Sequence, residues 1–173
     1  LESLLPSDNS ILSEAIRYSV LDGGKRLRPI LVYLIGELGN AENNSLDILA
    51  GSVEIIHCYS LIHDDLPSMD DDDLRRGKPT THKKYDEATA ILAGDALQPF
   101  AFELVTTINI SDKDKLSIIK SLAEACGYQG MVGGQIKDIH SNDIKDVESL
   151  DIMHSQKTGR LIQSSIETAG ILS

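Results

Sequence analysis

Apolar side chains recur at the spacing of α-helices along nearly the whole chain of 173 residues, and no stretch alternates as a half-buried strand would. This pattern predicts an all-α fold. Breaker residues divide it into segments, with Gly23-Gly24 after the first helix and Pro67 after the third. The expected helices are Ile11 to the glycine pair, Ile30–Leu38, Leu46–Asp65, Lys84–Thr107 with a kink at Pro99, Asp112–Gln129 and Val147–Ile171.

Four glycines, Gly127, Gly130, Gly133 and Gly134, lie close together between two of these segments. They fit the end of one helix, and they equally fit a place where two helices approach closely. The sequence leaves both interpretations open.

The composition is that of a globular protein with enough apolar residues, 41%, to bury a core, and we expect one domain over residues 1–173. A formal net charge of -11 disfavours a nucleic-acid partner, because a phosphate backbone requires a basic face. Cys58 and Cys126 lie far apart in apolar contexts, which favours a reducing compartment. No apolar run reaches the ~20 residues of a membrane span, and the first residues lack a signal-peptide pattern, so we predict a cytoplasmic protein.

The most distinctive segment holds six aspartates within ten positions, from Asp64 to Asp73, and is followed by Arg75 and Arg76. Carboxylates at this density repel one another unless a cation lies among them, and divalent cations with oxygen ligands are the usual solution. Guanidinium groups bind phosphate oxygens through paired hydrogen bonds. The segment therefore predicts a site for a diphosphate bound through Mg²⁺. The alternative is an acidic loop in solvent, but helical apolar sequence on both sides argues against it.

The helix before this run has a polar face. His57, Ser60 and Asp64 are three and then four positions apart, which places them on one side of a helix. Its neighbours are apolar, so His57 taken alone fits a hydrogen-bonded core histidine better than a ligand-binding one.

Asp64 and Asp70 are six positions apart, so their carboxylates would not meet on a regular helix. A bulge or short loop at Pro67-Ser68 would bring Asp70 back beside Asp64. Asp65 would then hydrogen-bond nearby or support the metal less directly.

The sequence Asp64-Asp65-x4-Asp70, with the following Leu74-Arg75-Arg76-Gly77-Lys78-Pro79-Thr80, resembles the first aspartate-rich motif of the trans-isoprenyl diphosphate synthases, and of the bacterial farnesyl diphosphate synthases in particular. Other segments resemble further motifs of this family, in the same order, between residues 23 and 159. They are Gly23-Gly24-Lys25-Arg26-Leu27-Arg28-Pro29, Glu54 through His57, Ala93-Gly94-Asp95, Gly134-Gln135-x2-Asp138 and Lys157-Thr158-Gly159. The resemblance therefore covers nearly the whole chain.

This resemblance implies an isoprenoid-synthase-like bundle of helices around a deep central cavity, normally in a homodimer. It also implies a reaction. An allylic diphosphate loses its diphosphate with the assistance of Mg²⁺, the double bond of isopentenyl diphosphate attacks the allylic cation, and a proton is then lost. Cations would neutralise the leaving group while an apolar cavity keeps water away from the carbocation.

The resemblance also implies roles for individual residues. The implied Mg²⁺ ligands are Asp64 and Asp70, with Asp65 and Asp138 in support. The implied contacts of isopentenyl diphosphate are Lys25, Arg28, His57 and Arg76. On the allylic side are Arg75 and Lys157, with Thr158 stabilising the cation, and Gln135 with Asp138 positioning Lys157 or metal-bound water. The implied catalytic set is Asp64, Asp70, Arg75, Lys157 and Thr158.

Some of these residues also fit plainer roles. Lys25 and Arg28 could be ordinary surface charges, although Pro29 fixes the turn and favours their presentation to one ligand. Gln135 and Asp138 could form no more than the polar face of a helix.

Product length is set in this family by side chains about one turn before the first aspartate, here Tyr59 and Ser60. On a helical wheel Ser60 lies about 40° from Asp64 and Tyr59 about 140°, so Ser60 points more directly below the metal site. An aromatic residue at this place, together with the Pro67-Ser68 insertion, nevertheless resembles the bacterial enzymes that make farnesyl diphosphate. We expect that product, with geranylgeranyl diphosphate as the alternative.

The family's second aspartate-rich motif is not found within the 173 residues. We therefore expect a C-terminally incomplete synthase sequence that has little or no turnover by itself. Two other classes stay open. A non-catalytic partner subunit of a prenyl synthase would not need the complete first site, and a class I terpene cyclase would have no use for the cationic set around His57.

Overall fold

The computed structural model describes residues 1–21, 23–141 and 146–173, and its regular structure there is almost entirely helical, as the periodicity predicts. The elements are α1 (Ile11–Leu21), α2 (Leu27–Leu38), α3 (Asn43–Asp64), α4 (Thr81–Lys84), α5 (Glu87–Thr106), α6 (Asp112–Cys126), α7 (Met131–Ile139), α8 (Val147–His154), the π-helical turn η2 (Ser155–Gly159) and α9 (Arg160–Ile171). The turn η2 joins α8 and α9 without a break, so the expected long last helix is present.

Several helix boundaries differ from the expected ranges: α2 and α3 each begin three residues earlier, and two other differences have a local cause. α5 begins at Glu87, later than expected, since the Asp86 side chain accepts a hydrogen bond from a backbone amide and caps a new helix. α6 ends before Gly127, whose backbone is extended. Pro99 lies within α5, which is helical on both sides of it.

A short hairpin, which the sequence pattern did not predict, follows α3. Strand β1 (Leu74–Arg75) pairs antiparallel with β2 (Lys78–Pro79), so the first residue of one lies opposite the last residue of the other. The turn between them has left-handed backbone at Arg76 (φ 54°) and Gly77 (φ 81°), as two-residue hairpin turns require. Strands of two residues are too short for an alternating pattern to reveal them.

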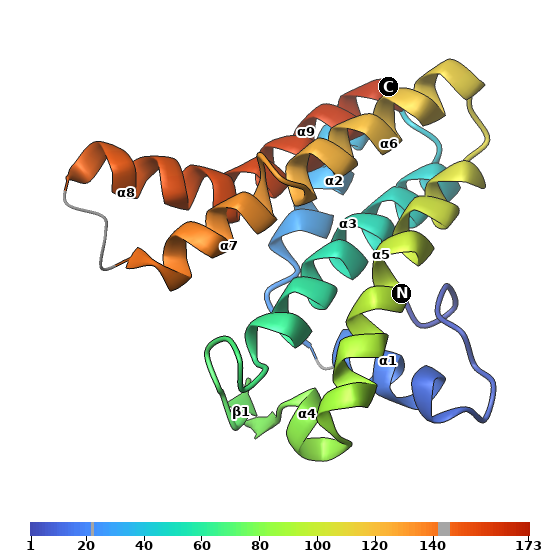
Figure 1. Cartoon of the computed structure of the whole chain (residues 1–173). Coiled ribbons are helices and arrows are strands. Elements are labelled where there is room, and N and C mark those ends of the chain that lie inside the picture. The colour runs from blue at the N-terminus through green and yellow to red at the C-terminus, as the bar shows by residue number, and fades with distance from the viewer. Residues whose placement is uncertain (22, 142–145) are drawn as a thin grey trace.

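The central helix is α3, and α2, α5 and α9 pack against it (Figure 1). Leu46, Leu49, Ile55 and Ile56 on this helix are fully buried. By length and composition α3 could also cross a membrane, contrary to the expectation from the sequence, but 78% of the apolar stretch is buried inside the protein. Packing against its three neighbours therefore accounts for its hydropathy.

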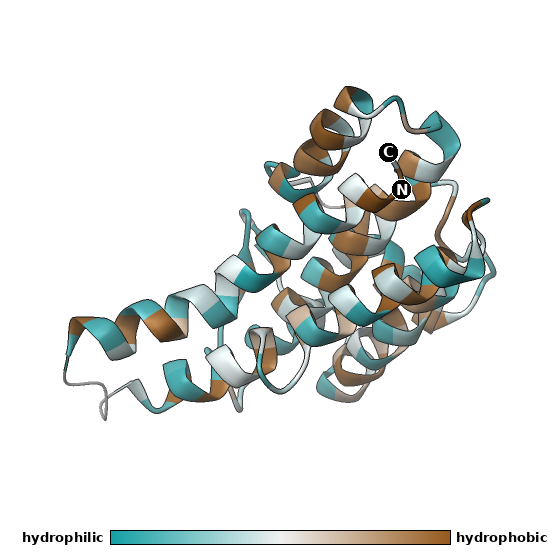
Figure 2. Ribbon diagram, turned by 90° about the horizontal axis from the view of Figure 1, so that it is seen from above, coloured by the Kyte–Doolittle hydropathy of each residue, from teal (hydrophilic) through white to brown (hydrophobic). Residues whose placement is uncertain are grey.

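α7 and α8 lie side by side and extend from the rest of the molecule as an arm, in both views (Figures 1 and 2). The glycine-rich segment at the base of the arm combines the two roles that the sequence left open. Gly127 follows the end of α6, and Gly134 lies where α7 closely approaches η2.

Candidate functional site

The aspartate run lies where α3 ends and a loop begins. Asp64 is the last helical residue, and the chain then folds back so that the amide of Asp70 donates to the backbone carbonyl of Asp64 over 2.9 Å. The amide of Asp71 donates to the Leu66 carbonyl over 3.1 Å and closes the same loop. The turn at Pro67-Ser68 thus brings Asp70 beside Asp64, as the spacing argument expects.

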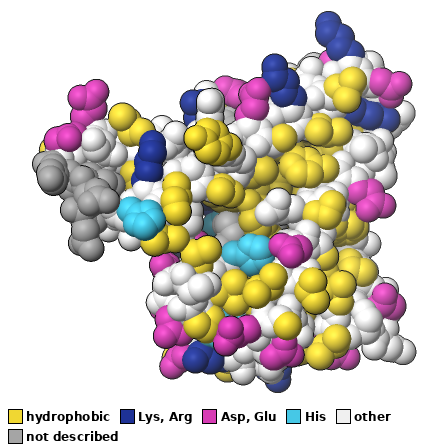
Figure 3. All heavy atoms as spheres, in the orientation of Figure 1, with side chains coloured by type: hydrophobic (Ala, Val, Ile, Leu, Met, Phe, Trp, Pro, Cys, Tyr) yellow, Lys and Arg dark blue, Asp and Glu magenta, His cyan; other side chains and the backbone are white. Residues whose placement is uncertain are grey.

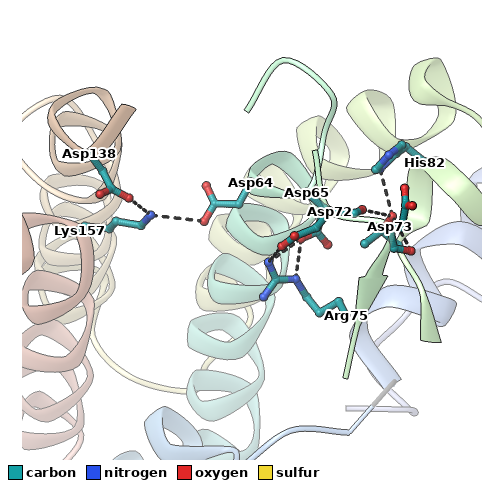
Figure 4. A network of polar contacts seen from close by, with 9 residues as sticks. Asp64, Asp65, Asp72, Asp73, Arg75, His82, Asp138 and Lys157 are labelled. Atoms are coloured by element: carbon teal, nitrogen blue, oxygen red, sulfur yellow. Dashed lines mark hydrogen bonds and ion pairs between the residues drawn. The ribbon is translucent and has the colours of Figure 1, made fainter. Parts of the chain in front are cut away.

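The Asp64 carboxyl is largely buried and points toward Lys157 (Figure 4). Its side chain is 16% exposed, and its Oδ2 lies 4.0 Å from Lys157 Nζ. Burial raises the pKa of Asp64 to about 6; Lys157 acts in the opposite direction and the Asp70 carboxylate adds to the increase. A cation bound beside Asp64 would stabilise the charged form of this buried carboxylate, so Asp64 is suited to bind a metal ion.

Lys157 extends from η2 and connects the arm to the end of α3. Its Nζ donates a hydrogen bond to Asp138 on α7 and lies within ion-pair distance of Asp64 (Figure 4). The structure therefore brings together three residues that the sequence singled out. The resemblance implies that Gln135 helps to position Lys157 or metal-bound water; its side-chain N and O are buried and have no hydrogen-bond partner in the described part of the chain.

Asp65 points away from Asp64 and binds Arg75 on β1 (Figure 4). Arg75 Nε donates to Asp65 Oδ1 over 2.6 Å, and the same guanidinium lies 3.6 Å from Asp72 Oδ2. Burial raises the pKa of Asp65 and the hydrogen bond from Arg75 opposes that increase, while the same bond raises the pKa of Arg75. Asp65 thus anchors Arg75, as expected of a carboxylate that hydrogen-bonds nearby.

Two residues that the sequence reasoning missed hold the hairpin in place. The Thr80 hydroxyl donates to the Asp72 carbonyl over 2.7 Å, and His82 Nδ1 lies 3.2 Å from the same hydroxyl oxygen. Because the single hydroxyl proton is given to Asp72, Nδ1 of His82 must carry a proton and donate it. Both residues are buried, so this bond fixes the strand that returns from Arg75.

A cationic cluster lies further back along α3, around His57. Burial, followed by Arg28, Arg76, Arg75 and Arg26, lowers the pKa of His57 to about 3. His57 is therefore neutral at pH 7 among several guanidinium groups. Burial lowers the pKa of Arg28 as well, and its Nε is buried with no hydrogen-bond partner among the residues described. An anion bound here would satisfy that donor and offset the surplus positive charge.

Arg76 lies across the glycine pair that precedes α2. Its Nη1 donates to the Gly23 carbonyl, and a Cβ built on Gly24 would fall 2.6 Å from the guanidinium carbon. Gly24 also has a left-handed backbone, φ 105°, so only glycine fits this place readily. Lys25 follows directly and is exposed to solvent.

A buried ion pair ties this cluster to the core, and sequence reasoning assigned it no role. Arg26 Nη1 lies 2.6 Å from Glu54 Oε1, and Arg26 Nη2 donates to the Val20 carbonyl over 2.7 Å. The Glu54 side chain is only 2% exposed. A glutamate within the apolar run of α3 was the available signal, because a buried carboxylate requires a partner.

One cavity of about 360 Å³ lies between α3, α5, α7 and η2, and each cluster reaches it through two residues, Asp64 with Lys157 and Arg28 with His57. The predicted site residues that line it are Arg28, His57, Tyr59, Ser60, Asp64, Gln135, Lys157 and Thr158. The predicted residues that do not line it are Lys25, Asp65, Asp70, Arg75, Arg76 and Asp138.

Tyr59 and Ser60 both border the cavity, but they differ in what they offer it. Tyr59 is buried and packs edge-on against His63, with ring centroids 5.9 Å apart. The Ser60 hydroxyl donates to the His57 carbonyl over 2.8 Å, so its proton is already used. Tyr59 therefore forms the bulkier wall, although the helical wheel places Ser60 nearer to Asp64.

The donor set at the acidic end suits Mg²⁺. Asp64 and Asp70 offer hard oxygen ligands, and within residues 1–21, 23–141 and 146–173 no three His, Cys, Asp or Glu side chains converge on a closed metal site. Mg²⁺ is usually held by one or two carboxylates together with substrate phosphates and water. The residues present thus fit a metal that binds together with a diphosphate.

Comparison with known proteins gives consistent matches over nearly the whole chain. The family model described as polyprenyl synthetase matches residues 9–173. Farnesyl diphosphate synthase of Haemophilus influenzae is 52% identical, with 98% of this chain and 58% of that protein aligned. Chloroplastic geranylgeranyl pyrophosphate synthase of Capsicum annuum is 43% identical, over 99% of this chain and 47% of that protein.

Among solved structures, a geranyltransferase from Legionella pneumophila superimposes with a TM-score of 0.95 at 43% identity, covering 99% of this chain and 63% of that one. This likeness confirms the all-α fold that the sequence predicted. The chain spans 58% of the length of the Haemophilus relative.

Proposed function

This chain belongs to the polyprenyl synthetase family, and on that basis we propose that the protein condenses isopentenyl diphosphate with dimethylallyl or geranyl diphosphate to give farnesyl diphosphate. The observation that carries the proposal is that one cavity has an acidic cluster at one border and a cationic cluster at another. The acidic cluster, Asp64 with Asp70 and Lys157, suits a diphosphate that must leave. The cationic cluster around His57 suits a diphosphate that is only bound.

At the acidic end, Mg²⁺ held by Asp64 and Asp70 would supply positive charge to the diphosphate leaving group. Lys157 adds an ammonium group at the same place, and Asp138 keeps it there. Arg75 is held by Asp65 on the other side of the helix end and does not line the cavity, so its guanidinium would meet the diphosphate from that side.

At the cationic end, the chain binds isopentenyl diphosphate without activating it. Arg28 offers a donor that has no partner within the described residues, and Arg76 and Lys25 add charge. Because His57 is neutral, it can donate a hydrogen bond to a phosphate oxygen without the cost of burying a charged imidazolium.

Between the two ends, the cavity limits both water and the length of the product. Apolar walls would keep water away from a carbocation, and Thr158 borders the space in which that cation would form. Tyr59 limits the prenyl tail, which favours farnesyl diphosphate. Geranylgeranyl diphosphate is the second candidate, because a geranylgeranyl pyrophosphate synthase is 43% identical.

We also propose a cytoplasmic homodimer. Apolar side chains gather on the face that α5 and α6 present in Figure 3, and Ile91, Leu92 and Leu116 on these helices are exposed. A face of this kind suits burial against a second copy. Sedimentation would give the mass of the particle, and a monomer at micromolar concentration would contradict this part of the proposal.

The central experiment incubates the purified protein with Mg²⁺, isopentenyl diphosphate and either dimethylallyl or geranyl diphosphate. We expect farnesyl diphosphate from both by chromatography, and no product when EDTA is present. Residues 1–173 by themselves are expected to turn over poorly, because they hold one aspartate-rich motif where the resemblance implies two. A folded whole protein that transfers no prenyl group would refute the proposed activity.

A further inference from the structure

α7 lies closer to η2 than a side chain at position 134 would allow. A Cβ built on Gly134 would fall 2.2 Å from the backbone N of Lys157 and 2.6 Å from its Cα, whereas ordinary Cβ contacts begin at 3.4 Å. The obstructing atoms belong to the backbone, so no side-chain rotation could relieve the clash. Gly134 therefore determines how closely the turn that carries Lys157 approaches α7.

The same helix also holds the other end of Lys157. Asp138 lies four positions after Gly134, on the same face of α7, and accepts the hydrogen bond from Lys157 Nζ. The backbone and the ammonium group of Lys157 are thus both located by one helix. The 4.0 Å separation between Nζ and Asp64 depends on these two contacts.

The turn itself adds to the argument. η2 is π-helical, and such turns insert an extra residue that makes a helix bulge locally, often at functional sites. Here the bulge carries Lys157 and lies against Gly134, a position of α7 without a Cβ.

We propose that Gly134 is a positioning residue for the allylic diphosphate. Its missing side chain lets Lys157 lie where the ammonium group reaches Asp138 and the metal-binding end of α3 together. The inference rests on the function proposed above and extends it to a residue that touches neither substrate nor metal.

The kinetic test compares Gly134→Ala with Gly170→Ala, a matched change on α9 where the new Cβ meets nothing within 4 Å. For Gly134→Ala we expect kcat/KM for the allylic diphosphate to fall about 100-fold, because a misplacement of about 1 Å has that effect on a positioned group. The KM for isopentenyl diphosphate is expected to stay unchanged, since its cluster lies on α2, α3 and the hairpin. Gly170→Ala should match the parent. A role in folding alone would affect both substrates alike, and that outcome would overturn the inference.

Crystal structures of the two variants separate this inference from the proposed function. We expect Lys157 to move away from Asp138 and Asp64 in Gly134→Ala only. An unmoved Lys157 overturns the inference, and so does a Gly134→Ala protein that no longer unfolds cooperatively, because the glycine would then serve the fold as a whole. A parent protein without prenyl transfer refutes the proposed function, while a displaced Lys157 would still show how Gly134 acts.

Discussion

The buried ion pair between Arg26 and Glu54 gives the most direct test of what holds the cationic cluster in place. Removing one partner of a buried pair leaves an uncompensated charge and destabilises a fold by about 3 to 5 kcal/mol. Glu54 is 2% exposed at its side chain, whereas Arg26 is 23% exposed. Water can therefore reach one side of the pair, which places the expected loss at the lower end, about 3 kcal/mol for Arg26→Met.

The measurement is equilibrium unfolding in urea, followed by circular dichroism and accompanied by a thermal melt. For a chain of this length, a loss of about 3 kcal/mol corresponds to a decrease in Tm of about 6 to 12 °C. Arg26→Met keeps most of the apolar stem of the side chain. The loss thus reports on the guanidinium contacts with Glu54 and with the Val20 carbonyl.

A double-mutant cycle supplies the control. Glu54→Leu with Arg26→Met replaces the pair by apolar groups, a change that is often neutral or stabilising, so most of the lost stability should return. Affinity for isopentenyl diphosphate should not return in full, because the Arg26 guanidinium is one of the positive charges around His57 and the double variant still lacks it. A single variant that loses less than about 1 kcal/mol would refute the reasoning, since exposed pairs contribute no more than that.

Three further predictions concern the site itself. Asp64→Ala is expected to abolish prenyl transfer with unchanged helicity, and activity within a few-fold of the parent would remove Asp64 as a metal ligand. Tyr59→Ala is expected to release longer products on chromatography, whereas Tyr59→Phe, which keeps the bulk, should not; an unchanged product length in the alanine variant would discount Tyr59 as the limiting wall. The pKa of His57 lies below its ordinary value in the folded state, so between about pH 6.5 and 3 the unfolded chain binds a proton at His57 and the folded chain does not. The free energy of unfolding therefore falls as the pH drops from about 6.5 towards 3. His57→Gln should flatten this part of the curve of unfolding free energy against pH, and an unaltered slope would contradict the assignment.

Sequence reasoning was most successful for structural features that depend on residues close together in the sequence. The return of Asp70 to Asp64 follows from a proline and six positions of local geometry, and the Asp70 amide does bond to the Asp64 carbonyl. Helix types could be predicted for the same reason, since the spacing of apolar residues reports directly on a buried face. The start of α5 was misplaced because a side-chain cap at Asp86 overrides the periodic pattern.

Contacts between distant segments could be predicted only through the family resemblance. Nothing in the periodicity links Lys157 to Asp64, and the contact exists because η2, α7 and the end of α3 meet at one cavity. Gln135 shows the same limit of reasoning from the sequence. The resemblance implies that it positions Lys157 or metal-bound water, and its amide has no hydrogen-bond partner among the described residues.

The two adjacent aspartates at the end of α3 show why identical residues acquire different tasks. Successive side chains on a helix point about 100° apart, so Asp64 and Asp65 cannot face the same neighbour. Asp64 faces the cavity and Lys157, while Asp65 is turned to the hairpin and is occupied by Arg75 (Figure 4). If Arg75 binds a phosphate as proposed, its guanidinium would lose little conformational freedom on binding, because Asp65 already holds it.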